Sequence, residues 1–207
     1  MRSAGSVSWS ISTDRWDHQL ERALWFRAAE RIEVPADGLV TGPPDVHPVP
    51  EPSLPSDGEL VEGWLWWWRA LFVRPSLTGP RKSPGMADLN RVGPPDFEGL
   101  AGYPALRHVV STRWGEANAW HSARKRAGIE AFRAARAQGP GREGAVVRAV
   151  EAEIGHKAGP FSLRIIVLPV LDQQIRSAGT ATYLVPELVH ASGAYDVWLR
   201  ELVRKLA

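Results

Sequence analysis

The chain has 207 residues, of which 44% are hydrophobic and 23% are charged, and its formal net charge at pH 7 is +2. These values predict one globular domain, residues 1–207, and the small net charge favours neither acidic nor basic partners. Because cysteine is absent, disulfides, thiolate metal sites and cysteine nucleophiles are excluded.

The first predicted element is a strand over residues 6–12, SVSWSIS, in which apolar residues alternate with serines. This period-two alternation is typical of a strand with one buried face. A helix is predicted over residues 14–33. Thr13 or Asp14 is expected to cap it, and Pro35 requires that it end beforehand.

Two long segments rich in proline, residues 35–58 and 74–103, lie on either side of the next predicted helix. Proline lacks a backbone N–H donor, so neither segment can form a continuous helix or a central strand. Loops of this length are uncommon in compact domains and are often functional. We therefore expect them to act as lids or as part of a contact surface.

The helix between these segments is predicted to begin near Gly58 and to contain WLWWWRALF, residues 64–72, with four tryptophans in five positions. At 3.6 residues per turn, three of the tryptophans fall on a broad apolar face, whereas Trp66 lies on the polar side beside Arg69. The simpler interpretation of these indoles is a tryptophan-rich core. Because an exposed tryptophan is typical of interfaces, Trp66 and Arg69 are predicted to contact a partner.

A long helix is predicted from Pro104 to about Gln138, and another over residues 142–156. Residues 104–148 carry nine basic and three acidic side chains. Such a surface can bind phosphates or an acidic partner, although charged helix faces are often simply solvated. The predicted basic binding residues are Arg126, Arg133 and Arg136.

If the protein is an enzyme, its site is expected on the long helix, over residues 104–138, with residues 74–103 as a cover. The candidate catalytic side chains there are His108, Arg113, Glu116, His121 and Arg124. No two histidines stand at the helical spacing that places two ligands on one metal, and no phosphate-binding glycine motif is present. Neither a metal nor a cofactor is therefore expected.

The C-terminal third predicts two strands, residues 162–170 and 181–189, followed by an amphipathic helix. Because two strands alone are marginally stable, residues 6–12 are the natural third strand. The predicted fold class is α+β: mostly helical, with a small sheet of three or more strands and helices packed mainly on one side.

The leading functional hypothesis is a non-catalytic interaction or ligand-binding protein that uses an aromatic surface, with a protein partner or an acidic ligand. An enzyme built on residues 104–138 is the alternative, and nucleic-acid binding through the basic helix 124–148 is the third. The oligomeric state is left open.

Location is predicted from what the sequence lacks. No signal peptide and no apolar run of about 20 residues is visible, so a cytoplasmic location without membrane contact is expected. The richness in Ala, Arg, Gly and Pro over Lys is associated with bacterial genomes of high GC content.

Overall fold

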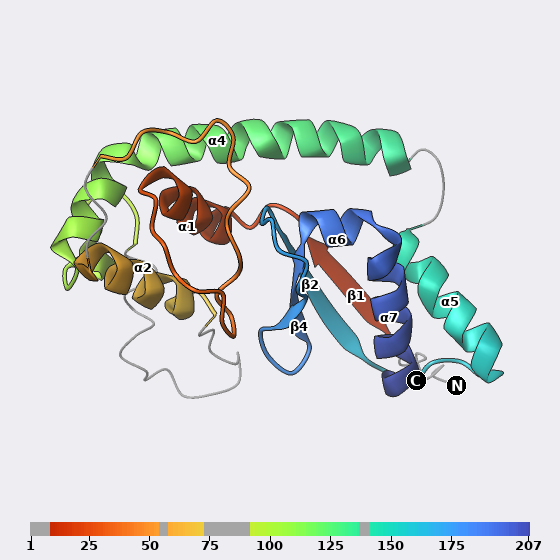
Figure 1. Cartoon of the computed structure of the whole chain (residues 1–207). Coiled ribbons are helices and arrows are strands. Elements are labelled where there is room, and N and C mark those ends of the chain that lie inside the picture. The colour runs from red at the N-terminus through yellow and green to blue at the C-terminus, as the bar shows by residue number, and fades with distance from the viewer. Residues whose placement is uncertain (1–8, 54–57, 73–91, 137–140) are drawn as a thin grey trace, which may run out of the picture. The chain divides into compact units, whose positions relative to one another are not determined.

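The computed structural model describes residues 9–53, 58–72, 92–136 and 141–207 (Figure 1). Within these ranges it is an α+β protein with a four-stranded mixed sheet, which confirms the predicted fold class. None of the helices in the described ranges combines the length and apolarity needed to cross a bilayer.

The chain divides into two compact units, which are described separately. Unit 1 contains residues 1–15, 125–168 and 173–207, and unit 2 contains residues 16–124 and 169–172. The organisation of residues 1–207 as a single domain stays a prediction.

Unit 1 is built on a sheet with the strand order β1-β2-β4-β3. The strands β1 (Ser10–Asp14), β2 (Ser162–Leu168) and β4 (Thr182–Pro186) are parallel, and the short β3 (Arg176–Ser177) pairs antiparallel with β4. The N-terminal segment therefore does supply the third strand. A two-residue strand such as β3 is too short to produce a hydrophobic period, which is why the sequence did not predict it.

Two of the strands end at or next to a proline, which has no backbone N–H group to donate to the neighbouring strand. β4 ends at Pro186 and β2 ends immediately before Pro169, so both are shorter than the predicted 181–189 and 162–170. At the N-terminus, β1 covers residues 10–14, so pairing with β2 carries the strand two residues beyond its predicted end at residue 12. Of the predicted strand, residues 6–8 lie outside the described residues.

The helices of unit 1 cover one face of this sheet (Figure 1). They are α5 (Arg142–Ile154), the short α6 (Glu187–Ala191) and α7 (Gly193–Leu206). Gly155 adopts φ 79° and closes α5 in the left-handed conformation that glycine tolerates. The residues that form this core without measurable exposure are Val147, Val150, Ile165, Val185, Tyr195, Leu199 and Val203.

Unit 2 contains α1 (His18–Ala29), α2 (Gly58–Ala70), a short 3₁₀ helix (Glu98–Leu100) and the first part of α4 (Pro104–Arg136). The long helix agrees with its predicted range up to residue 136, beyond which residues 137–140 lie outside the described ranges.

The start of α1 differs from the prediction. Asp17 is the N-cap, and its carboxylate accepts hydrogen bonds from the N–H groups of Gln19 and Leu20 at 3.1 and 3.2 Å. Asp14 cannot cap the helix because it is the last residue of β1, where its carboxylate pairs with Arg164 at 2.6 Å.

Three of the four tryptophans of α2 confirm the predicted apolar face, but Trp66 is not exposed as predicted. Trp64, Trp67 and Trp68 are buried, whereas Trp66 is half-buried with its ring 5.5 Å from that of Tyr103. Two of the buried indoles find backbone acceptors, as buried N–H groups require: Trp64 Nε1 donates to Ala23 O at 2.7 Å and Trp68 Nε1 to Leu39 O at 2.9 Å.

Candidate functional site

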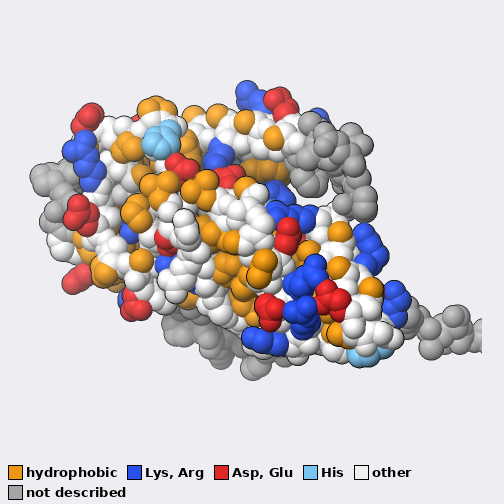
Figure 2. Space-filling view, turned by 45° about the vertical axis from the view of Figure 1, so that its right-hand side comes forward, with side chains coloured by type: hydrophobic (Ala, Val, Ile, Leu, Met, Phe, Trp, Pro, Cys, Tyr) orange, Lys and Arg blue, Asp and Glu red, His pale blue; other side chains and the backbone are white. Residues whose placement is uncertain are grey.

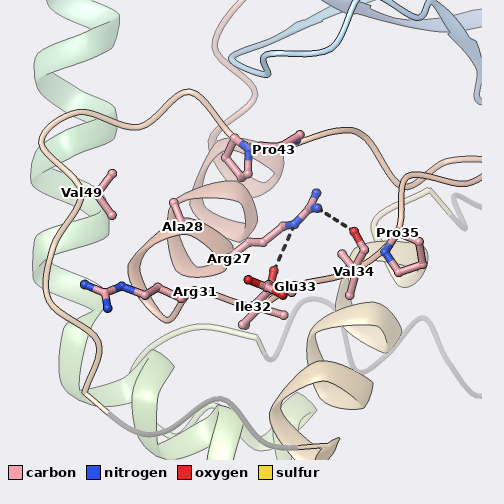
Figure 3. A pocket seen from close by; sticks show the side chains of 10 residues that line it. Arg27, Ala28, Arg31, Ile32, Glu33, Val34, Pro35, Pro43 and Val49 are labelled. Atoms are coloured by element: carbon pink, nitrogen blue, oxygen red, sulfur yellow. Dashed lines mark hydrogen bonds between the residues drawn. The ribbon is translucent and has the colours of Figure 1, made fainter.

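In unit 2, the proline-rich segment after α1 is held against the helices by buried charged side chains. Arg27 of α1 is only 5% exposed, and its hydrogen bonds within the described residues go to backbone carbonyls of this segment (Figure 3). The acceptors are Thr41 O (2.8 Å), Gly42 O (3.0 Å), Val34 O (3.1 Å) and Ile32 O (3.4 Å).

Burial lowers the pKa of Arg27 to about 10, and the negative charge of Asp172 opposes this shift. Arg27 therefore stays charged at neutral pH. One guanidinium thus fixes four peptide carbonyls spread over eleven residues that form no helix or long strand.

A second buried charge fastens the far end of the same segment. The Glu30 carboxylate, which is fully buried, accepts from the Ser53 N–H at 2.8 Å and from the Ser53 hydroxyl at 2.9 Å. Arg113 of α4 pairs with Glu30 at 2.5 Å and also donates to Glu51 O at 3.0 Å. Residues 51–53 are therefore fixed to both α1 and α4.

A third attachment comes from residues 169–172, which pair with residues 42–45 through backbone hydrogen bonds of 2.8 and 2.9 Å. The Asp172 carboxylate also accepts from the Gly42 N–H at 2.5 Å. A Cβ on Gly42 would lie 2.6 Å from Asp172 Cβ, so this approach requires glycine.

These attachments shape an open groove of about 770 Å³ between the end of α1 and the proline-rich segment (Figure 3). Val49 on its rim is 51% exposed, and Leu171, whose N–H donates to Pro43 O, is 50% exposed. The lining residues are Arg27, Ala28, Arg31, Ile32, Glu33, Val34, Pro35, Pro43, Pro44 and Val49.

Four of the five predicted catalytic candidates form ion pairs on α4. Arg113 donates to both oxygens of Glu116 at 3.1 and 2.8 Å, which raises the pKa of Arg113 and lowers that of Glu116. About two turns further on, His121 Nδ1 and Arg124 Nε lie 2.7 and 3.1 Å from the two oxygens of the buried Glu21.

The structure therefore brings these candidates together in two pairs and not in one site. Arg113 of the first pair binds Glu30, the C-cap of α1, and both members of the second pair contact Glu21. His108 is exposed and lies about 20 Å along the helix from His121. Most of the predicted cover, residues 74–91, lies outside the described residues. No group of His, Asp and Glu side chains that could hold a metal is present among the described residues.

The predicted binding residues lie on different elements. Arg69 of α2 is exposed, as are Arg126 and Arg133 of α4, while the side chain of Arg136 lies outside the described part of the chain. Trp66 is partly covered by Tyr103. On the face drawn in Figure 2, basic and acidic side chains are interspersed instead of forming large areas of one sign.

Unit 1 contains a buried polar cluster that sequence reasoning missed. Its centre is His190, whose Nδ1 lies 3.5 Å from Arg15 Nη1 and whose Nε2 lies 3.7 Å from Glu143 Oε1. The His190 ring packs 4.4 Å from that of Tyr195, and the Thr13 hydroxyl donates to Glu143 at 3.2 Å. Because an arginine can only donate, the His190 proton belongs on Nε2, toward Glu143.

Electrostatics keep the Glu143 carboxyl ionised in this cluster. The contact with His190 and the hydrogen bonds from its own N–H and Thr13 lower the pKa of Glu143 to about 2, whereas burial raises the pKa of Tyr195. His190 Nε2 and Tyr195 Oη are buried without a hydrogen-bond partner among the described residues. The cluster joins four elements, since Thr13 belongs to β1, Glu143 to α5, His190 to α6 and Tyr195 to α7. Neither of the two buried atoms is open to solvent.

Comparison with protein-family models, with curated proteins and with solved structures gave no match. Function is therefore argued from the chemistry of the described residues. Of the arrangements above, the groove of unit 2 is the one that is both preformed and open to solvent.

Arg27 was not among the predicted site residues. In the sequence it is one of three arginines in this stretch, with Arg22 and Arg31, and no local pattern distinguishes it. Its role depends on carbonyl groups up to 15 residues away, which no helical period reveals.

Proposed function

We propose that the protein is a non-catalytic binding protein that takes an extended segment of a partner protein into the groove of unit 2. The observation that carries this proposal is an open groove with exposed apolar rims whose wall is fixed from beneath by the buried Arg27. This keeps the functional class predicted from the sequence but moves the surface, since none of the lining residues is aromatic.

The shape of the groove favours a chain segment over a small molecule. Small-molecule sites enclose most of their ligand, whereas this groove is open along its length. Val49 and Leu171 are two of the few large hydrophobic side chains exposed in the described residues. Exposed apolar side chains beside a groove are typical of protein interaction sites.

The fixed wall also favours binding energetically. Ordering a loop on association costs free energy, and a binding surface that is already ordered avoids much of this cost. Here the buried hydrogen bonds of Arg27 and Glu30 order the wall before any partner arrives.

The two other functions stay proposals with less support. The enzyme candidates on α4 are engaged with each other and with buried carboxylates. Nucleic-acid binding would use Arg126 and Arg133, which are exposed but are separated by the exposed Glu130.

The proposal is tested by selection from a library of random peptides about nine residues long, which span about 30 Å when extended. The library is displayed on phage and selected against the wild type, Val49→Asn and Val197→Asn. Val197 lies on α7 and is 64% exposed against 51% for Val49, so the two variants introduce the same neutral amide at comparably exposed positions.

Wild type and Val197→Asn are expected to enrich the same peptides, and Val49→Asn is expected to lose them because an amide on the rim disfavours apolar contact without adding charge. Equal enrichment on all three proteins, or none on the wild type, would overturn the proposal.

A further inference from the structure

The wall of the groove is acidic. Residues 33–53 contain Glu33, Asp37, Asp45 and Glu51 and no lysine or arginine. Each of these carboxylates either lines the groove or lies within two residues of a lining residue. Three of them are exposed, and the fourth is partly exposed.

The positive charges of the groove are already engaged. The Arg27 guanidinium is surrounded by carbonyl oxygens, and Asp172 lies close enough for its charge to raise the pKa of Arg27. Arg31 on the rim pairs with Glu51 at 3.0 Å. Among the described residues, no lysine or arginine pairs with Glu33, which lines the groove, or with Asp37, two residues from the lining Pro35, so the described part of the rim keeps net negative charge.

We infer that the segment bound in the groove is basic: an extended apolar stretch that carries lysine or arginine side chains to meet the carboxylates of residues 33–51. This inference rests on the proposed function and adds the chemical class of the partner. The apolar part of such a segment fits against Ala28, Pro43 and Val49, and its cations reach the rim.

A basic side chain suits this rim because its charge stays in water. Lysine and arginine place a long apolar stem along the groove while the charged head remains solvated. Glu33 and Glu51 are exposed, so a cation can approach without the cost of desolvating a buried charge. The Arg31–Glu51 pair is exposed on both sides and weak, so Glu51 can exchange partners.

The peptides selected on the wild type supply the probe. They are expected to be enriched in lysine and arginine over the unselected library. A fluorescently labelled enriched peptide should lose about fivefold in affinity for each cation replaced by glutamine, measured by fluorescence anisotropy at low salt. The preference should shrink in 0.3 M salt, since exposed charges are screened.

Two charge-reversal variants separate the groove from general electrostatics. Glu33→Lys places a cation in the groove, and Glu62→Lys makes the same change at an exposed position of α2. We expect Glu33→Lys to weaken the basic peptide about tenfold and Glu62→Lys to change it by less than about twofold.

The outcomes distinguish this inference from the function on which it rests. Enrichment of peptides without a charge preference, or equal effects of Glu33→Lys and Glu62→Lys, would overturn the basic partner while the groove remains a binding site. An enrichment that Val49→Asn does not remove would overturn both.

Discussion

Removing the Arg27 guanidinium tests the physical basis of the groove. Arg27→Met keeps an unbranched apolar stem and deletes the hydrogen bonds that Arg27 donates to backbone carbonyls, while those of Glu30 and Asp172 remain. The matched control is Arg31→Met, four residues later in the sequence. The Arg31 side chain is 60% exposed, and it forms a surface ion pair with Glu51.

The expected loss follows from the contacts. Three hydrogen bonds of 2.8 to 3.1 Å join Arg27 to carbonyls, and each bond to a charged donor contributes about 1.5–3 kcal/mol, or about 5–9 kcal/mol together. Burial of the charge opposes this stabilisation. It lowers the pKa of Arg27 from 12.5 to about 10, which corresponds to a free-energy cost of about 3 kcal/mol for the charged form. The net loss for Arg27→Met is therefore about 4 kcal/mol.

Urea unfolding of the two variants measures the difference in free energy. Arg31→Met should stay within about 0.5 kcal/mol of the wild type, as surface substitutions usually do. Hydrogen exchange should show where the structure opens, with faster exchange over residues 32–42 in Arg27→Met alone. If the two variants unfold alike and exchange alike over these residues, the proposed anchoring by Arg27 is wrong.

Two further predictions concern the buried residues of each unit. In unit 2, Trp68→Ala should cost about 3–5 kcal/mol as a core deletion, whereas Trp66→Ala should cost about 1 kcal/mol or less because its ring contacts Tyr103 from a half-buried position; equal losses in urea unfolding would contradict the helix faces. In unit 1, the carboxyl of Glu143 has a depressed pKa, so its contribution is complete above pH 4.5 and is lost as the pH falls toward 2. The stability difference between wild type and Glu143→Gln should therefore shrink by about 3 kcal/mol between pH 5 and pH 2, and a difference independent of pH would refute this.

Prediction from the sequence succeeded where the structure depends on neighbouring residues. The spacing of three and four residues between apolar side chains in α2 predicted that Trp64, Trp67 and Trp68 face the interior. They do so because a helix fixes the direction of each side chain relative to its neighbours. Alternation and β-branched composition located three of the four strands, although pairing set their ends.

Prediction of the site was less complete, because charged residues on a helix are ordinarily predicted to face solvent. Glu21 and Arg27 of α1 and its C-cap residue Glu30 are buried, yet each falls within an ordinary stretch of alternating charge. Their partners lie up to 103 residues away in the sequence. The candidates on α4 were recognised as a polar set, but their pairing with α1 was not visible.

The sequence by itself determined the helices, the inward indoles and the proline-rich segments, since each follows from local backbone chemistry and from side-chain periodicity. Only the tertiary structure decided which charges became buried and which carbonyls they bind. The groove belongs to this second class: its wall has no regular secondary structure, so its shape comes from Arg27, Glu30 and Asp172 reaching it from other parts of the chain.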